Sequence, residues 1–295
     1  MWRALVVGIN IGVVIALAVV LNDSGADDDP ETIATATSTF RLPRLDDPAG
    51  AASPPDDAAS TSTTAPADVQ IDASAWVVLD LDGTVVAGDD IDRELPIASL
   101  TKLPLALVAA DDVLAAEAHV VSEEAATITG RRVGWPASTS VGPTELIDGL
   151  LRTSGNDAAI VTANAAGGVD IVLAQISAIG GDGIRDVTGL RSDSVATAGQ
   201  VAEWMRQALT QPELRVALEA RAGEPLPGQT GILLGNDREP TILAAKTSFS
   251  TAAGQSMAAL VTWEDTERIV VVLNARSPID AALDAYIAAW WEGGT

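Results

Sequence analysis

Runs with the pattern of β-strands lie toward both ends of the sequence after residue 70, and helical patterns fill the stretch between them. At the front, 76–81 and 84–87 flank Asp82-Gly83, a pattern typical of a β-hairpin with a two-residue primed turn. Three more strand-like runs come near the end: 241–247, 255–263 and 268–275. This order predicts an α/β protein of the α+β type, with one antiparallel β-sheet built from both chain ends, flanked by helices, and a helical subdomain inserted.

The predicted helices are 99–119, 143–152, 157–166, 169–179, 197–220 and 279–292. Ser99 is suited to capping the first of them, and Pro143 to the first position of the second. The last is amphipathic and is expected to pack Trp290 or Trp291 against the domain.

The first 70 residues have a different character. Residues 4–21 form an unbroken apolar run whose length, at about 1.5 Å per residue, is close to the hydrocarbon thickness of a bilayer. We expect 1–21 to be a transmembrane signal anchor, with a cleaved signal peptide as the alternative. Residues 22–70 are expected to form a flexible acidic linker rich in Ala, Ser, Thr and Pro. The remainder, 71–295, is expected to be one domain held outside the cytoplasm at the cell membrane.

Composition excludes several classes of function. The formal net charge of −24 opposes binding to nucleic acid and to anionic lipid surfaces. The chain has no cysteine and one histidine, His119, which we interpret as a surface or packing residue. These counts exclude disulfides, thiol nucleophiles and cysteine-based zinc sites, and they argue against Ser-His-Asp triads and two-histidine zinc sites.

Only two lysines occur in the chain, and both stand in short motifs with serine. Lys102 closes Ser99-Leu100-Thr101-Lys102, and Lys246 opens Lys246-Thr247-Ser248. All the other basic residues among the 17 are arginines. An arginine keeps its proton in a protein, whereas a buried lysine can release it. The two amines therefore indicate acid–base chemistry, which points to an enzyme.

Ser99 and Lys102 have the spacing that places two side chains on one face of a helix, about a turn apart. Serine becomes a good nucleophile when a neighbouring base removes its proton. A lysine can be that base if burial or nearby positive charge lowers its pKa from about 10.4 toward about 7 or 8. Backbone N–H groups at the start of the helix are suited to an oxyanion. The pair predicts a serine acyl-transfer site.

Two further motifs extend this site. Ser154-Gly155-Asn156 offers a hydroxyl and an amide at a turn, and a positive φ at Gly155 would let both side chains point the same way. A plain break between two helices is the alternative interpretation. Lys246, at the predicted end of a strand, is either a solvated strand end or a positive charge. In the second case it meets a substrate carboxylate and lowers the pKa of Lys102.

The three motifs, in this order and spacing, resemble those of the penicillin-recognising serine transferases: S-x-x-K, S-x-N and K-T-G. Within that superfamily the chain is similar to the serine-type D-alanyl-D-alanine carboxypeptidases over roughly residues 73–276. The matching segments are 97–102, 153–158, 188–190, 196–198, 246–248 and 251–254. The resemblance implies a β-lactamase/transpeptidase-like fold and removal of the terminal D-alanine from a peptidoglycan stem peptide. Stem peptides and β-lactams are the implied ligands.

The resemblance also implies catalytic roles. Ser99 would be the acylated nucleophile, Lys102 its base, and Ser154 a proton relay. The backbone N–H groups of Ser99 and Phe249 would form the oxyanion hole. No metal and no organic cofactor is implied, and the sequence leaves the oligomeric state open.

The implied substrate-binding residues come from the second and third motifs. Asn156 would hold the substrate amide, and Lys246 with Thr247 would meet the terminal carboxylate. The family's third motif normally ends in glycine, whereas this chain has Ser248, which would add a hydroxymethyl group on the face of Lys246. The segment 229–232 also lacks an arginine that assists carboxylate binding in relatives.

Three alternatives stay open at this point. One is a catalytically impaired protein that binds wall peptides or β-lactams without turnover, and another is an exported domain of unrelated function. The third is a β-lactamase, one class of which uses a glutamate with an asparagine four residues later. No candidate glutamate has that asparagine: Glu203, Glu213, Glu219, Glu224 and Glu239. Because the chain ends one helix after the last strand, we expect no β-rich C-terminal domain.

Overall fold

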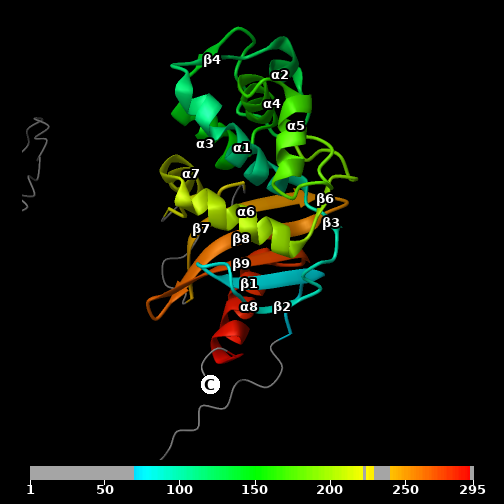
Figure 1. The fold of residues 1–295 in the computed structure, drawn as a ribbon, viewed down its shortest axis with the longest axis vertical. Coiled ribbons are helices and arrows are strands. Elements are labelled where there is room, and N and C mark those ends of the chain that lie inside the picture. Colours follow the sequence, from blue (N-terminus) through cyan, green and yellow to red (C-terminus); the bar gives the residue numbers. More distant parts are fainter. Residues whose placement is uncertain (1–69, 222–223, 229–239, 293–295) are drawn as a thin grey trace, which may run out of the picture. The chain divides into compact units, whose positions relative to one another are not determined.

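The computed structural model describes residues 70–221, 224–228 and 240–292. Five long strands are present: β1 (Ala75–Asp80), β2 (Val85–Asp89), β7 (Thr241–Ser250), β8 (Gly254–Trp263) and β9 (Thr266–Ala275). They form one antiparallel sheet in the order β2-β1-β9-β8-β7 (Figure 1). Ala75 at the start of β1 pairs with Leu273 near the end of β9. The sheet is thus built from both chain ends, and the predicted fold class is confirmed.

Helices cover both faces of this sheet, which explains why its strands are apolar along most of their length. The helix α6 (Ala198–Thr210) packs on one face and α8 (Pro278–Glu292) on the other (Figure 1). Alternate residues of β9 accordingly enter two separate cores. Val271 belongs to the core on the α6 side, whereas Val270 and Val272 pack in the core that contains Tyr286 of α8.

The segment between β2 and β7 forms the helical part of the domain (Figure 1). Its elements are β3 (Leu95–Pro96), the 3-10 turn η1 (Ala98–Thr101), α1 (Lys102–Ala115), β4 (His119–Val120), α2 (Glu123–Thr127), β5 (Ser140–Val141), α3 (Pro143–Leu151), α4 (Asn156–Ala165), α5 (Val169–Ala178), β6 (Val195–Ala196), α6 and α7 (Pro212–Leu218). The helix α1 packs against α3, α4, α5 and α6. Because it is enclosed in this way, its leucines Leu103 and Leu105 are fully buried.

The first predicted helix differs from the structure at both ends. Ser99 lies in the turn η1 and not in the α-helix that follows. The helix α1 also ends before His119, which belongs to β4 and pairs with Val141. The ring Nε2 of His119 lies 2.8 Å from the carbonyl oxygen of Val113. Strand pairing and this contact override the helix propensity of the alanine-rich segment, because tertiary context commonly outweighs propensity. His119 is a half-buried packing residue.

Two further element boundaries differ. The predicted helix 197–220 is two helices, α6 and α7, because Pro212 lacks the N–H that would continue α6 and instead takes the first turn of α7. The strand β7 continues to Ser250, so Lys246 lies within the strand and not at its end. Pairing of Ser250 with Gly254 at the β7–β8 turn carries the strand this far.

The turn between β1 and β2 is longer than predicted. The N–H of Asp80 donates to the carbonyl oxygen of Thr84, which encloses residues 81–83. Gly83 has φ +94, but Asp82 is not among the residues with positive φ. A primed two-residue turn would need a positive φ at Asp82. Its carboxylate instead accepts the N–H of Thr84 at 2.8 Å, as aspartate commonly does in loops, so the predicted turn type is wrong.

Some predictions lie outside the described residues. They are the membrane anchor at 1–21, nearly all of the linker at 22–70, the segment 229–232, and the packing of Trp290 or Trp291. Within the described ranges, no single helix has both the length and the apolar composition of a membrane span. The helices α4 and α5, bent by 86°, meet those two criteria only as a pair.

Candidate active site

Ser99 is presented by a tightly packed turn. It lies in η1 directly before α1, and the preceding Ala98 has φ +45, a conformation uncommon for a residue with a side chain. This turn rests on Gly189, whose φ is +80. A Cβ at Gly189 would lie 2.1 Å from the carbonyl oxygen of Ala98 and 2.8 Å from the backbone nitrogen of Ser99. Glycine is therefore required at 189 to let the turn that carries Ser99 approach.

Lys102 is the first residue of α1 and is completely buried. Its Nζ lies 3.0 Å from Ser99 Oγ, 3.0 Å from Asn156 Oδ1 and 2.6 Å from the carbonyl oxygen of Thr188. Burial lowers the pKa of Lys102 from 10.5 to about 7, and the positive charge of Arg131 acts in the same direction. The amine beside the serine hydroxyl can therefore lose its proton near neutral pH.

A carboxylate opposes this shift. Asp186 raises the pKa of Lys102. It accepts hydrogen bonds from the Thr188 hydroxyl and from the N–H groups of Thr188, Gly189 and Arg191. Burial would raise the pKa of Asp186, but these hydrogen bonds more than offset that effect and hold the pKa below its ordinary value. Asp186 thus stays ionised and fixes the loop whose Thr188 carbonyl meets Lys102.

Lys246 lies within β7 and is also completely buried. Its Nζ donates to Ser154 Oγ and to the carbonyl oxygen of Thr247, both at 2.9 Å. Burial lowers the pKa of Lys246 well below its ordinary value, and the charges of Lys102 and Arg131 lower it further. The alternative interpretation of Lys246 as a solvated strand end is therefore wrong.

The two buried amines repel each other. The sequence predicts that Lys246 lowers the pKa of Lys102, whereas the structure gives burial and Arg131 as the causes at Lys102 and places the effect of the pair on Lys246. Whichever lysine loses its proton first does so while the other lysine is still charged. The other lysine then titrates beside a neutral amine. The pocket therefore favours states in which at most one of the two amines carries a positive charge.

Ser154 links the second motif to Lys246 through an unusual backbone conformation. It is buried and has φ +59. The sequence predicts the positive φ at Gly155, but Gly155 has φ −65 and is the N-cap of α4. Glycine is needed there because a Cβ would lie 2.6 Å from Asp157 Oδ1 and 2.9 Å from Val133 Cγ2. The strained residue is thus the serine itself, held in place by its tertiary contacts.

Asn156 begins α4, and its amide is held at both ends. Its Oδ1 accepts a hydrogen bond from Lys102, and its Nδ2 donates to the carbonyl oxygen of Thr129 at 2.8 Å. Its backbone N–H donates to the carbonyl oxygen of Arg131 at 2.7 Å. The loop before Arg131 approaches closely, since a Cβ at Gly130 would lie 2.7 Å from Asn156 Nδ2. These contacts fix which end of the amide faces the amine.

A pocket of about 240 Å³ lies beside these groups. Six predicted site residues line it: Ser99, Ser154, Asn156, Thr247, Ser248 and Phe249. Lys102 and Lys246 are buried behind the pocket wall, where they bond Ser99 and Ser154 respectively. The structure therefore brings together all eight residues that the sequence predicts, although they come from three distant parts of the chain.

The third motif forms one wall of this pocket. Thr247 Oγ1 donates to the carbonyl oxygen of Pro227 at 2.9 Å. Ser248 is buried, and its Oγ has no hydrogen-bond partner within the part of the chain that the structure describes. The side chain of Phe249 is 71% exposed at the rim. Ser248 therefore lines the pocket, and its buried hydroxyl is unsatisfied among the described residues, at a position where the family pattern has glycine.

Arg131 is a site residue that sequence reasoning missed. It lines the pocket, and its Nη1 donates to the carbonyl oxygen of Gly228 at 2.7 Å. Gly228 itself is close to the third motif, because a Cβ there would lie 2.6 Å from Lys246 Nζ and 2.5 Å from the carbonyl oxygen of Thr247. The guanidinium is thus anchored next to the buried amines. Nothing in the local sequence around Arg131 indicates which part of the fold its loop will contact.

Comparison with known proteins identifies the family. A family model described as D-alanyl-D-alanine carboxypeptidase matches residues 59–277, which is most of the chain. The chain belongs to this family. It is a serine-type, carboxypeptidase-like hydrolase.

Individual relatives agree with this assignment. D-alanyl-D-alanine carboxypeptidase DacB2 of Mycobacterium tuberculosis is 32% identical over 197 residues, which are 61% of this chain and 67% of that protein. A crystal structure of a D-alanyl-D-alanine carboxypeptidase from the same organism matches with a TM-score of 0.64 and 25% identity, covering 79% of this chain and 94% of that one. Penicillin binding protein 6B from Escherichia coli has the same fold, with a TM-score of 0.64, 21% identity, and coverage of 78% and 80%.

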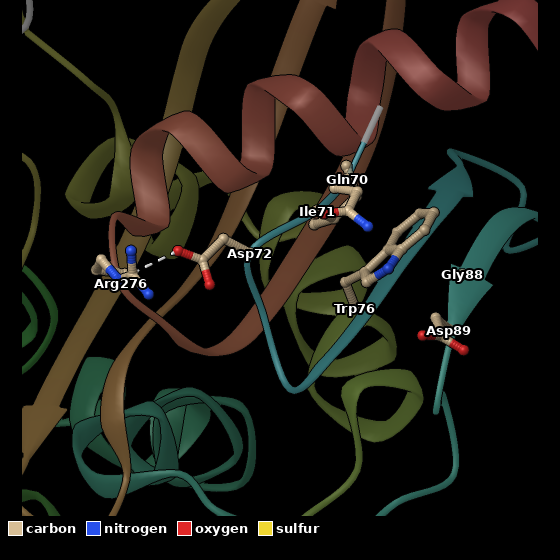
Figure 2. A pocket seen from close by; sticks show the side chains of 7 residues that line it. All are labelled: Gln70, Ile71, Asp72, Trp76, Gly88, Asp89 and Arg276. Atoms are coloured by element: carbon tan, nitrogen blue, oxygen red, sulfur yellow. Dashed lines mark ion pairs between the residues drawn. The ribbon is translucent and has the colours of Figure 1, made fainter. Parts of the chain in front are cut away.

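This carboxypeptidase-like domain has a second cavity of about 830 Å³ beside β1 and β2. Figure 2 shows Trp76 and Asp89 on adjacent strands, with the Asp72–Arg276 pair nearby. The carboxylate and guanidinium of that pair are 3.5 Å apart and both are exposed. None of the predicted site residues lines this cavity, so the larger space is not where the reactive groups lie. Among the described residues, no group of three or more potential metal ligands gathers.

Proposed function

We propose that this chain is an exported serine acyl-transfer enzyme that removes the terminal D-alanine from peptidoglycan stem peptides through an acyl-enzyme on Ser99. The observation that carries the proposal is the position of the Lys102 amine. It is buried, lies 3.0 Å from Ser99 Oγ, and has a pKa of about 7. A base with a pKa near the working pH is the most effective kind.

The hydrogen bonds of Lys102 suit a neutral amine. A neutral –NH2 group has two N–H donors and one lone pair. Asn156 Oδ1 and the carbonyl oxygen of Thr188 are acceptors, so they take the two N–H groups. The lone pair then faces Ser99 Oγ and can accept its proton as the oxygen attacks the substrate carbonyl. The Oγ–carbon bond forms and the bond to the leaving nitrogen of D-alanine breaks.

Ser154 is suited to relay to that leaving nitrogen the proton that Lys102 removes from Ser99: its hydroxyl gives a proton to the nitrogen and regains one from the protonated Lys102. Because Lys246 Nζ donates to Ser154 Oγ at 2.9 Å, the hydroxyl proton of Ser154 is available to another acceptor. The backbone N–H groups of Ser99 and Phe249 are proposed as the oxyanion hole, by the resemblance of their motifs to the family pattern. Water then hydrolyses the acyl-enzyme and restores Ser99.

Asn156, Lys246, Thr247, Ser248 and Phe249 are proposed to bind the peptide. The first two are the residues whose contacts reach the catalytic groups. Thr247, Ser248 and Phe249 line the same wall of the pocket. The substrate is therefore expected to lie along β7, with its carboxylate end toward the third motif.

The proposed location is the outer face of the cell membrane. Residues 1–21 would be a single-pass anchor and 22–70 a linker that holds the domain away from the bilayer. Stem peptides and β-lactams would be the ligands there.

The test uses the purified protein, a fluorescent penicillin and a model peptide that ends in D-alanyl-D-alanine. We expect a long-lived penicillin adduct on Ser99, detected by mass spectrometry, together with release of D-alanine; Ser99→Ala should lose both. Rapid destruction of penicillin without a lasting adduct would instead identify a β-lactamase. Neither an adduct nor D-alanine release would identify the non-catalytic binding protein, for which Ser248 in the pocket is the favouring observation.

A further inference from the structure

Two residues that line the pocket have hydrogen-bond donors to which the proposed mechanism gives no specific contact, the guanidinium of Arg131 and the hydroxyl of Ser248. Only Nη1 of Arg131 is bonded within the described residues, to the carbonyl oxygen of Gly228. A guanidinium has five N–H donors in a planar fork, so most of them remain for a ligand. Ser248 is 6% exposed, and its Oγ has no partner in the ranges that the structure describes. A buried hydroxyl without a partner costs stability unless a ligand satisfies it.

Lys246 and Thr247 of the third motif have few hydrogen-bond donors left for a substrate carboxylate. Thr247 Oγ1 already donates its one proton to the carbonyl oxygen of Pro227. Lys246 Nζ already donates to Ser154 Oγ and to the carbonyl oxygen of Thr247. A neutral amine at Lys246 has two N–H groups, and these two contacts use both of them. Neither side chain therefore has a donor to spare for a carboxylate while these bonds persist.

The charges of the groups around the pocket also indicate Arg131 as the partner of a carboxylate. A substrate carboxylate entering a partly buried pocket needs a positive partner. Burial lowers the pKa of both lysines, and the charges of Lys102 and Arg131 lower that of Lys246 further, so positive charge on the two amines is disfavoured. A guanidinium keeps its proton under all ordinary conditions. Arg131 is therefore the permanent positive charge among the described residues that line the pocket.

We propose that Arg131 and Ser248 bind the terminal carboxylate of the substrate, Arg131 by a charged hydrogen bond and Ser248 by a neutral one. Gly228 connects them in space: its carbonyl oxygen anchors Arg131, and it packs against Thr247, the neighbour of Ser248. In this arrangement the serine at the end of the third motif supplies a donor and does not merely obstruct the pocket. The inference rests on the proposed function for the identity of the ligand, a peptide with a free carboxyl end.

The experiment measures binding and not turnover. The protein carries Ser99→Ala, and calorimetry compares an acetylated D-alanyl-D-alanine peptide with the same peptide amidated at its C-terminus. We expect the unmodified pocket to prefer the free acid. Arg131→Gln should reduce that preference about 10- to 100-fold, the range for a hydrogen bond to a charged group. Ser248→Ala should reduce it about 2- to 10-fold.

Arg132→Gln is the matched control. Arg132 is exposed like its neighbour Arg131 and bonds the carbonyl oxygen of Ala126, but it does not line the pocket. It should keep the full preference for the free acid. Thermal unfolding identifies any variant that fails to fold, and Ser248→Ala removes a single oxygen, so it tests the same pocket independently of Arg131.

Two results would overturn the inference: no preference for the free acid in the starting protein, or a preference that survives both Arg131→Gln and Ser248→Ala. The proposed function fails by a different observation. If a fluorophosphonate and a penicillin both leave Ser99 unlabelled in the otherwise wild-type protein, the acyl-enzyme mechanism is wrong, and the binding comparison still decides whether Arg131 and Ser248 hold a carboxylate.

Discussion

The two lysines occupy equally buried positions beside one pocket, yet their surroundings differ. Lys102 meets a hydroxyl and two carbonyl-type acceptors, and the carboxylates of Asp186 and Asp157 oppose the lowering of its pKa. Around Lys246 the named charges are positive, and they lower its pKa further. Burial thus sets the direction of the shift, and the neighbouring charges determine its extent. Lys102, the proposed base, is held near its point of titration, and Lys246 is held as a donor to Ser154.

Replacing Lys102 is expected to reduce acylation of Ser99 more than any other change proposed for these two lysines. Lys102→Arg keeps a positive charge but cannot accept a proton, so acylation of Ser99 by penicillin should fall by about 10³-fold or more. The measurement is the rate of adduct formation followed by mass spectrometry. Because a buried guanidinium can itself destabilise the protein, Lys102→Met serves as a second variant that buries no charge and should be equally inactive. Wild-type rates in Lys102→Arg would show that another group is the base.

Two glycines in left-handed conformations allow a sharper test of how Ser99 is placed. Gly189 has φ +80 and would bring a Cβ 2.1 Å from the carbonyl oxygen of Ala98, whereas Gly134 has φ +99 and no atom within 4 Å of its Cβ position. Both alanine variants should lose about 1–2 kcal/mol from the backbone conformation. Only Gly189→Ala should also slow acylation, by about 100-fold, because it displaces the turn that carries Ser99. Equal acylation rates in folded Gly189→Ala and Gly134→Ala would contradict the role given to this contact.

Removing a negative or a positive charge near Lys102 should shift its pKa in opposite directions. The amine acts as base only when neutral, so labelling of Ser99 by a fluorophosphonate should rise with pH through about 7. Asp186 raises the pKa of Lys102, so Asp186→Asn should lower that pKa and speed labelling at pH 6. Arg131 lowers it, so Arg131→Gln should raise the pKa and slow labelling at pH 6. Each change is expected to be about two- to fivefold, equivalent to about 0.5–1 kcal/mol. If the pKa for labelling shifted in the same direction in both variants, the opposite effects given to Asp186 and Arg131 would be wrong.

The sequence predicts the sheet and the order of its main elements, because these rest on local patterns. The eight predicted site residues follow from the two lysine motifs and from the resemblance to the family's motifs, and they meet at one pocket. Ser99 and Lys102 meet as the S-x-x-K spacing requires, even though a 3-10 turn replaces the predicted start of the helix. The sequence favours a positive φ at Gly155, because glycine is the usual residue in that conformation. The structure has it at Ser154, and only tertiary packing explains this exception.

The effects of Arg131 and Asp186 on Lys102 could not be predicted from the sequence. Each residue influences Lys102 from a different loop, and neither stands in a motif with the lysine. Their effect depends on which loops the fold brings beside α1, and this is a property of the whole domain. The sequence also places the end of β7 too early, because pairing with β8 extends the strand beyond the apolar run.

The most direct test of the account uses the fact that the chain contains two lysines. Labelling lysine with ¹³C at the ε-carbon gives two side-chain NMR signals, and Lys102→Met assigns them. We predict that the Lys102 signal titrates near pH 7 and that the Lys246 signal also titrates well below the ordinary lysine value. Two signals that both titrate near 10.5 would show that neither amine is available as a base at neutral pH, and the proposed mechanism would be wrong.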